Sequence, residues 1–122
     1  TMERLGMSDA DIATVQEEVN IFIHSAATIN FNEPLADAVN QNVLGTLRLF
    51  AIAQHCKRLL AFTHISTAYV NCIKKGLVEE VVYPLDFDPQ QMLDTLLEKS
   101  PEEIDRLTPQ LLGEYPNSYT FT

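Results

Sequence analysis

The chain has 122 residues, enough for one domain at most. Hydrophobic residues make up 46% and charged residues 20%, a balance typical of a globular protein and not of a disordered one. Lys and Arg together number 8 against 17 Asp and Glu, so the formal net charge is -9. This charge argues against nucleic-acid binding, because phosphate recognition needs clustered cations.

Membrane and redox features of the sequence are sparse. It has no apolar run of the roughly 20 residues that span a bilayer, and it has no signal-peptide pattern. Cys56 and Cys72 fit neither a disulfide framework nor a metal motif, which predicts a reducing, intracellular compartment and no metal site. The chain opens at Thr1 in a charged segment and stops at Thr122 in an amphipathic stretch, so we expect a fragment of a longer domain.

The first half predicts a strand–helix–strand unit after a short helix capped at Ser8. Residues 19–23 and 59–65 are apolar runs typical of buried strands in a parallel sheet. Residues 33–55 predict one long helix, because apolar side chains recur there every three or four positions. Short connections make this a βαβ unit with parallel strands and a right-handed crossover, and the fold class α/β. The apolar stripe of the long helix comprises Leu35, Val39, Val43, Leu47, Phe50 and Ala51.

The second half, from Asn71 to Gly113, predicts a helical insertion in the α/β domain. Asp88 and Ser100 each precede a proline, a pattern typical of a helix start. In chain order we expect an edge strand over 78–83, a helix over 88–99, a second helix from Ser100, and a further turn from Thr108 that Gly113 ends.

Two short segments mark a candidate site, because ligands of doubly wound sheets bind beyond the carboxyl ends of the strands. The segment from His24 to Ala27 leaves the first strand, and the segment from Ser66 to Tyr69 leaves the second. Small residues there let the backbone approach a flat ligand closely. The alternative is that each segment is only a tight turn.

Asn42 is a polar residue on the apolar stripe of the long helix. A buried amide destabilises by roughly 1–3 kcal/mol unless it is hydrogen-bonded. Asn42 therefore either ties the helix to a neighbouring loop or orders water or a side chain near the site.

Tyr119 stands at a predicted helix start. It either packs as an ordinary aromatic or takes part in proton transfer with a lysine one helical turn later, since a nearby cation lowers the pKa of a phenol. That lysine would be residue 123, one position beyond this chain.

Together these segments occur in the order found in extended short-chain dehydrogenases/reductases. Their sequence motifs resemble those of the fatty acyl-CoA reductases, also called male-sterility-type reductases, over nearly the whole chain. The resemblance is carried by His-Ser-Ala-Ala-Thr-Ile-Asn-Phe-Asn-Glu at 24–33, His-Ile-Ser-Thr-Ala-Tyr-Val-Asn at 64–71, Glu-Glu-Val-Val-Tyr-Pro at 79–84 and Tyr-Pro-Asn-Ser-Tyr-Thr-Phe-Thr at 115–122.

The resemblance implies part of a Rossmann-type doubly wound parallel sheet that uses NADPH to reduce a long-chain acyl-CoA to an aldehyde and then to a primary alcohol. Tyr119 would be the general acid, and Thr67 would donate a second hydrogen bond to the same oxygen, with the adjacent Ser66 as the alternative. The cofactor site would be formed by His24, Ser25, Ala26, Ala27 and Asn42.

The same resemblance indicates what this chain lacks. The four glycines of the sequence cannot compose the family's glycine-rich phosphate loop, and the lysine partner of Tyr119 falls past the end, so we expect the fragment alone to be inactive. It also implies an intracellular protein associated with the peroxisome or endoplasmic reticulum membrane.

Other interpretations stay open. A carrier-protein thioester reductase or a sugar-nucleotide epimerase would have the same fold and act on a different substrate. The sequence of the insertion favours the acyl-CoA enzymes over both. A catalytically dead nucleotide-binding scaffold would keep the fold alone.

Overall fold

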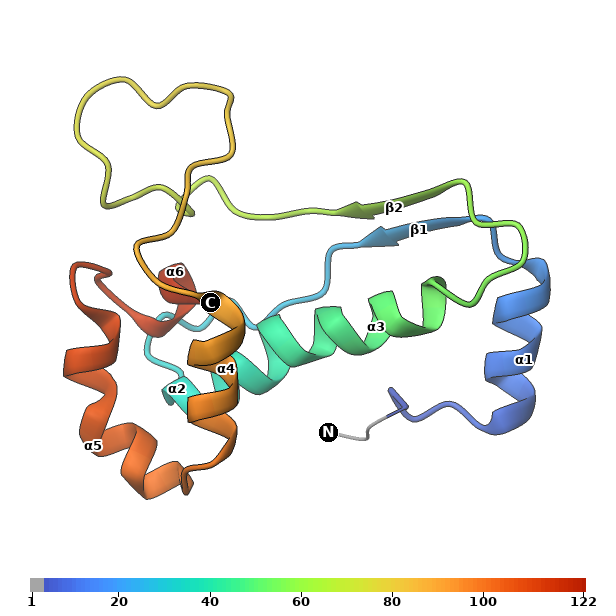
Figure 1. Ribbon diagram of the computed structural model, residues 1–122, viewed down its shortest axis with the longest axis horizontal. Coiled ribbons are helices and arrows are strands. Elements are labelled where there is room, and N and C mark those ends of the chain that lie inside the picture. Colours follow the sequence, from blue (N-terminus) through green and yellow to red (C-terminus); the bar gives the residue numbers. More distant parts are fainter. Residues whose placement is uncertain (1–3) are drawn as a thin grey trace.

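A pair of parallel strands forms the sheet of the molecule (Figure 1). In the computed structural model, which describes residues 4–122, β1 (Ile21–His24) pairs with β2 (Ala61–His64) in register, so that His24 lies opposite His64. The predicted parallel pairing is confirmed, and residues 4–122 form a mixed α/β structure with a two-stranded sheet. Residues 1–3, with which the predicted fragment begins, lie outside the described residues.

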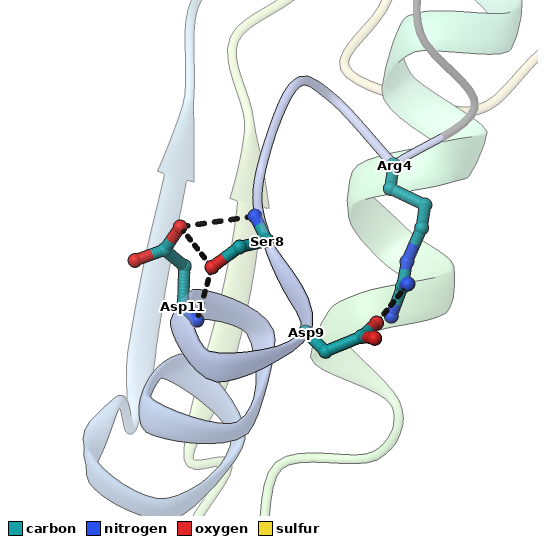
Figure 2. A network of polar contacts seen from close by, with 4 residues as sticks. All are labelled: Arg4, Ser8, Asp9 and Asp11. Carbon is teal, nitrogen blue, oxygen red and sulfur yellow. Dashed lines mark hydrogen bonds and ion pairs between the residues drawn. The ribbon is translucent and has the colours of Figure 1, made fainter.

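Helix α1 (Asp9–Glu18) precedes the sheet and begins with the predicted cap. The Ser8 hydroxyl accepts a hydrogen bond from the backbone N–H of Asp11 at 3.2 Å, and the Asp11 carboxylate accepts one from the Ser8 backbone N–H at 2.9 Å (Figure 2). Arg4 forms an ion pair with Asp9 in the first turn. These reciprocal bonds satisfy backbone donors that a helix N-terminus otherwise leaves unpaired.

A single helical rod connects the two strands. It consists of α2 (Leu35–Ala38), the π-helical segment η1 (Val39–Leu44) and α3 (Gly45–Ala53), with helical backbone angles at both junctions. The rod therefore confirms the long helix that was expected between the strands. The π-helical segment was not predicted.

The apolar stripe is correct only in the first part of the rod. Leu35 is buried as expected, whereas Leu47 and Phe50 are exposed and Ile52 and Ala53 are buried in their place. The two halves of the rod pack against different neighbours, α2 against α5 and α3 against α1. Beyond the π-helical segment the predicted stripe is wrong at Leu47 and Ala51, which are both exposed, whereas Phe50 still contacts Phe62 of β2.

Three helices follow the sheet: α4 (Pro89–Leu97), α5 (Pro101–Leu112) and α6 (Ser118–Phe121). The predicted caps of the first two are confirmed, because the side chains of Asp88 and Ser100 accept hydrogen bonds from backbone N–H groups in the first turn. Prolines at the first helical positions need no such partner.

Two expectations for this half are wrong. No new turn begins at Thr108, because α5 continues through Pro109 and ends at Gly113, whose positive φ of 55° suits glycine. Asp105, whose carbonyl loses its helical partner to the proline, is exposed and can bind water. Residues 78–83 form no strand, since the sheet within residues 4–122 offers them no neighbour and they belong to the open loop before α4 (Figure 1).

The main core lies among helices at one end of the molecule, where α2 packs against α5 (Figure 1). The carboxyl ends of both strands point toward this end. The buried cluster consists of Leu35, Val39, Leu93, Leu96 and Ile104.

Only one face of the sheet is covered. Helix α3 lies along one face (Figure 1). Phe22 is buried on that face, since it stacks on Phe62, which contacts Phe50 of α3. On the opposite face Ile23 is 72% exposed and Ile21 is also exposed, since no helix of the described part of the chain covers them. The strands are therefore half-buried here, contrary to the expectation for a sheet buried on both faces.

Candidate active site

A cavity of about 740 Å³ lies at the carboxyl ends of the strands. Residues 25–27 after β1 and residues 64–67, which begin with the last residue of β2, line one side of it. The loop at 81–87 and helix α6 line the other side. The topology thus brings together the two segments that the sequence singled out, along with the segment that carries Tyr119.

The three candidate hydroxyl groups, those of Ser66, Thr67 and Tyr119, all line this cavity. The Thr67 hydroxyl oxygen accepts a hydrogen bond from the Tyr69 backbone N–H at 3.2 Å. This bond holds the oxygen while leaving the hydroxyl its own hydrogen to donate. Thr67 and Tyr119 are half-buried, and Ser66 is exposed.

Tyr119 is held by the short helix α6. The Asn117 side chain caps this helix by accepting from the Thr120 backbone N–H at 2.9 Å. The buried Ser118 hydroxyl donates to the Glu33 carbonyl at 2.7 Å, which joins the helix to the loop after β1. The position of the phenol therefore depends on contacts with a segment far away in sequence.

Asn42 lies in the π-helical segment and bonds to two other parts of the chain. Its side-chain oxygen accepts from the Thr28 backbone N–H at 2.9 Å, and its amide nitrogen donates to the Thr28 carbonyl at 3.3 Å. The same nitrogen donates to the Thr122 hydroxyl at 3.1 Å. Asn42 thus ties the long helix to the loop after β1 and to α6, and it also lines the large cavity.

His24 is buried at the end of β1, and its ring stacks on that of His64. The two Nδ1 atoms lie 2.9 Å apart. Burial lowers the pKa of His24 below its ordinary value of 6.5, and the neighbouring His64 lowers it further. Neutral His24 is therefore favoured, and one neutral ring can donate its Nδ1–H in a hydrogen bond to the unprotonated Nδ1 of the other.

A second cavity, of about 690 Å³, adjoins the first on the other side of Ala26 and Ala27. His24 and Arg48 line it, and Arg48 also donates to the Asn40 side chain at 3.1 Å. The two alanines thus separate two hollows with little side-chain bulk, where a flat or extended ligand can approach the backbone. Arg48 supplies a positive charge for an anionic group.

Sequence reasoning missed His64, Arg48 and Phe31, whose ring stacks on Tyr119. A signal for His64 was present, because both strands contain Phe-x-His and register places Phe22 beside Phe62 and His24 beside His64. For Phe31 and Arg48 no local pattern distinguishes their positions.

The described residues show neither a metal-binding cluster nor a membrane-spanning helix. Within residues 4–122, no group of three or more His, Cys, Asp or Glu side chains is arranged to hold a metal ion. No helix in that range has the length and apolar character needed to cross a membrane. Cys56 and Cys72 are both free thiols.

Comparison with known proteins places these features in context. Residues 1–122 match the model of an NAD-binding family described as male sterility protein. The chain is 43% identical to fatty acyl-CoA reductase 1 of Xenopus laevis and 41% identical to that of Homo sapiens, in each case over all of this chain and 24% of the relative. It is 40% identical to fatty acyl-CoA reductase 2 of Bos taurus over 95% of this chain and 22% of that protein. The chain thus spans about a quarter of the length of these curated relatives.

Proposed function

The chain belongs to the male sterility protein family of NAD-binding domains, and we propose that the complete protein reduces a long-chain fatty acyl-CoA to a fatty alcohol with NADPH. The names of the similar proteins support this activity. The observation that carries the proposal is that Thr67 and Tyr119 line one cavity with the backbone of Ala26 and Ala27, at the carboxyl ends of parallel strands.

The residues at the strand ends fit a nicotinamide cofactor. Ala26 and Ala27 leave room for close approach to the backbone, and the cavities on either side of them accommodate an extended molecule. Arg48 lies where it would meet an anionic group of that molecule. When bound, the reduced nicotinamide supplies hydride to the carbonyl carbon.

Tyr119 and Thr67 act on the carbonyl oxygen. As hydride adds to the thioester carbon, both hydroxyls donate hydrogen bonds to the oxygen as it becomes negative, and loss of the CoA thiolate then leaves the aldehyde. In the second reduction a second hydride adds to the aldehyde carbon, and Tyr119 donates its phenol proton to the aldehyde oxygen, which becomes the alcohol hydroxyl. The protein stabilises the same developing charge in both reductions.

The larger sheet, the insertion and the membrane association are inferred from the family resemblance. We propose that the two strands belong to a larger, doubly wound parallel sheet in the complete protein, with residues 71–113 as an insertion. The exposed face that bears Ile21 and Ile23 supports this, because it is apolar like the interior of such a sheet. Association with the peroxisome or endoplasmic reticulum membrane stays a prediction.

The test uses the complete protein with NADPH and a series of saturated acyl-CoA thioesters. Oxidation of NADPH with formation of fatty alcohol supports the proposal, and absence of NADPH oxidation at every chain length from folded protein overturns it. Aldehyde as the sole product would instead assign the protein to the thioester reductases that stop at that stage.

Tyr119→Phe isolates the proton donor. Loss of the phenol hydroxyl should lower turnover on the order of 10²-fold or more if Tyr119 is the acid. Tyr69→Phe is the matched control, because it removes the hydroxyl of an exposed tyrosine that does not line the large cavity and keeps its ring and its backbone N–H. Unchanged turnover of Tyr119→Phe would remove Tyr119 from the proposed role.

A further inference from the structure

The ring of Phe31 contacts two tyrosines from different segments, Tyr119 in α6 and Tyr69 after β2. It stacks on Tyr119 with ring centroids 5.0 Å apart and an interplanar angle of 23°. It meets Tyr69 edge-on, with centroids 6.0 Å apart and an angle of 81°. Both geometries are favourable for aromatic pairs, so one ring connects the segment after β2 with helix α6.

The backbone of the same loop is attached to the start of α6. The Ser118 hydroxyl, directly before Tyr119, donates to the Glu33 carbonyl at 2.7 Å and lies 3.5 Å from the Phe31 carbonyl. The first residue of the helix is thus anchored on the loop that carries the stacking ring. The Phe31 ring and this hydrogen bond together restrict both the backbone and the side chain of Tyr119.

Helix α6 needs such restraint, because it has 4 residues. An isolated helix of this length is unstable in water, so its direction is determined by tertiary contacts. In the segment after β2, Tyr69 lies two positions after Thr67 and donates its backbone N–H to the Thr67 hydroxyl. A contact that holds Tyr69 therefore also holds the oxygen of Thr67.

We propose that Phe31 is a positioning residue that sets the distance between the hydroxyls of Thr67 and Tyr119. This inference rests on the proposed function, in which those two hydroxyls act on one oxygen. Phe31 is not among the described residues that line the 740 Å³ cavity, so it acts through its two aromatic neighbours and not by binding substrate. A displacement of about 1 Å between reacting groups can lower a rate by about 10²-fold.

The first experiment compares Phe31→Ala with the unchanged complete protein. We expect kcat to fall about 10-fold to 100-fold while KM for the acyl-CoA changes little, since the positioning is lost and the binding surface is not. Phe31→Tyr keeps the stacking ring and should retain turnover. An unchanged kcat in Phe31→Ala, or a loss seen only in KM, would overturn the proposal.

A double-mutant cycle tests whether Phe31 acts through Tyr119. In the Tyr119→Phe background the phenol proton is already absent, so Phe31→Ala should have much less effect on kcat than it has in the unchanged protein. The same factor in both backgrounds would show that Phe31 acts independently of Tyr119 and would contradict the inference.

Phe50→Ala is the matched control for loss of an exposed aromatic ring. Phe50 is 39% exposed against 44% for Phe31, and it makes an edge-on contact with Phe62 on the sheet, away from the cavity. It should leave kcat unchanged. If Phe31→Ala fails to fold, as judged by thermal unfolding, Phe31→Leu keeps the apolar volume without the stacking and is measured instead.

The results separate the inference from the function on which it rests. An impaired Tyr119→Phe beside a fully active Phe31→Ala overturns the role of Phe31 alone. A fully active Tyr119→Phe overturns the role of Tyr119 and that of Phe31 with it.

Discussion

The Nδ1 atom of His24 lies 2.9 Å from the Nδ1 atom of His64, so a hydrogen bond between two imidazoles joins the carboxyl ends of β1 and β2. One ring must donate and the other must accept, so the bond exists only while at least one Nδ1 is unprotonated. His64 lines the cavity itself, and Ser25, the first residue after His24, lines it as well. The hydrogen bond between the two rings therefore lies at the edge of the site.

Acidification should destabilise the protein through His24. Its pKa in the folded protein lies below the ordinary value of 6.5, because burial and then His64 disfavour the charged ring. The stabilisation is complete above pH 6.5 and is lost as the pH falls toward the lowered folded value, since the unfolded chain binds the proton more readily. The thermal unfolding midpoint should fall more steeply over this range in the unchanged protein than in His24→Gln.

His55→Gln is the control for this titration. His55 is exposed at the end of the long helix, with its Nδ1 2.8 Å from the Ala51 carbonyl. This variant should retain the steep decline of the unchanged protein. Equal pH dependence in His24→Gln and the unchanged protein would contradict the assignment to His24.

Replacing Asn42 should weaken the junction of three segments. Asn42→Leu leaves the Thr28 backbone N–H without its acceptor and removes the bond to Thr122, so we expect a loss of about 1–3 kcal/mol in the free energy of unfolding. Denaturant unfolding measures this loss. Gln41→Leu, an exposed position in the same π-helical segment, should stay within about 0.5 kcal/mol. Similar values for both variants would refute the role of the amide.

Leu35 anchors the helical core. It is 1% exposed and packs in the cluster formed with α4 and α5, so Leu35→Ala should lower the free energy of unfolding by about 2–5 kcal/mol through lost burial and the resulting cavity. Leu77→Ala serves as the comparison, since that side chain is 86% exposed in the loop before α4. A loss at Leu77 as large as that at Leu35 would place the core elsewhere.

The choice between Ser66 and Thr67 can be decided by removing each hydroxyl. Thr67→Val keeps the shape of the side chain and should lower kcat by about 10²-fold to 10³-fold if this hydroxyl stabilises the developing charge. Ser66→Ala should change turnover little. Steady-state kinetics with acyl-CoA and NADPH measure both, and the reverse pattern would transfer the role to Ser66.

Local patterns determined much of the architecture. Ser8, Asp88 and Ser100 cap their helices through bonds to backbone N–H groups within a few residues, so the sequence alone predicted those starts. The parallel strands and the helix between them were equally predictable, because residue periodicity indicates each element and a short connection limits the topology. The two strand ends lie side by side as predicted, and the segments that follow them line one cavity.

Tertiary packing decided the rest. Periodicity could not predict the π-helical segment at 39–44, since an inserted helical residue leaves no separate pattern in the sequence. The expected strand at 78–83 had suitable residues but found no neighbouring strand in the described part of the chain. Phe31 and Tyr119 are far apart in the sequence, and their stacking exists only because the loop after β1 and helix α6 meet at the same end of the fold. Backbone hydrogen bonding within a few residues specifies the elements, whereas contacts between distant segments exist only once packing has brought those elements together.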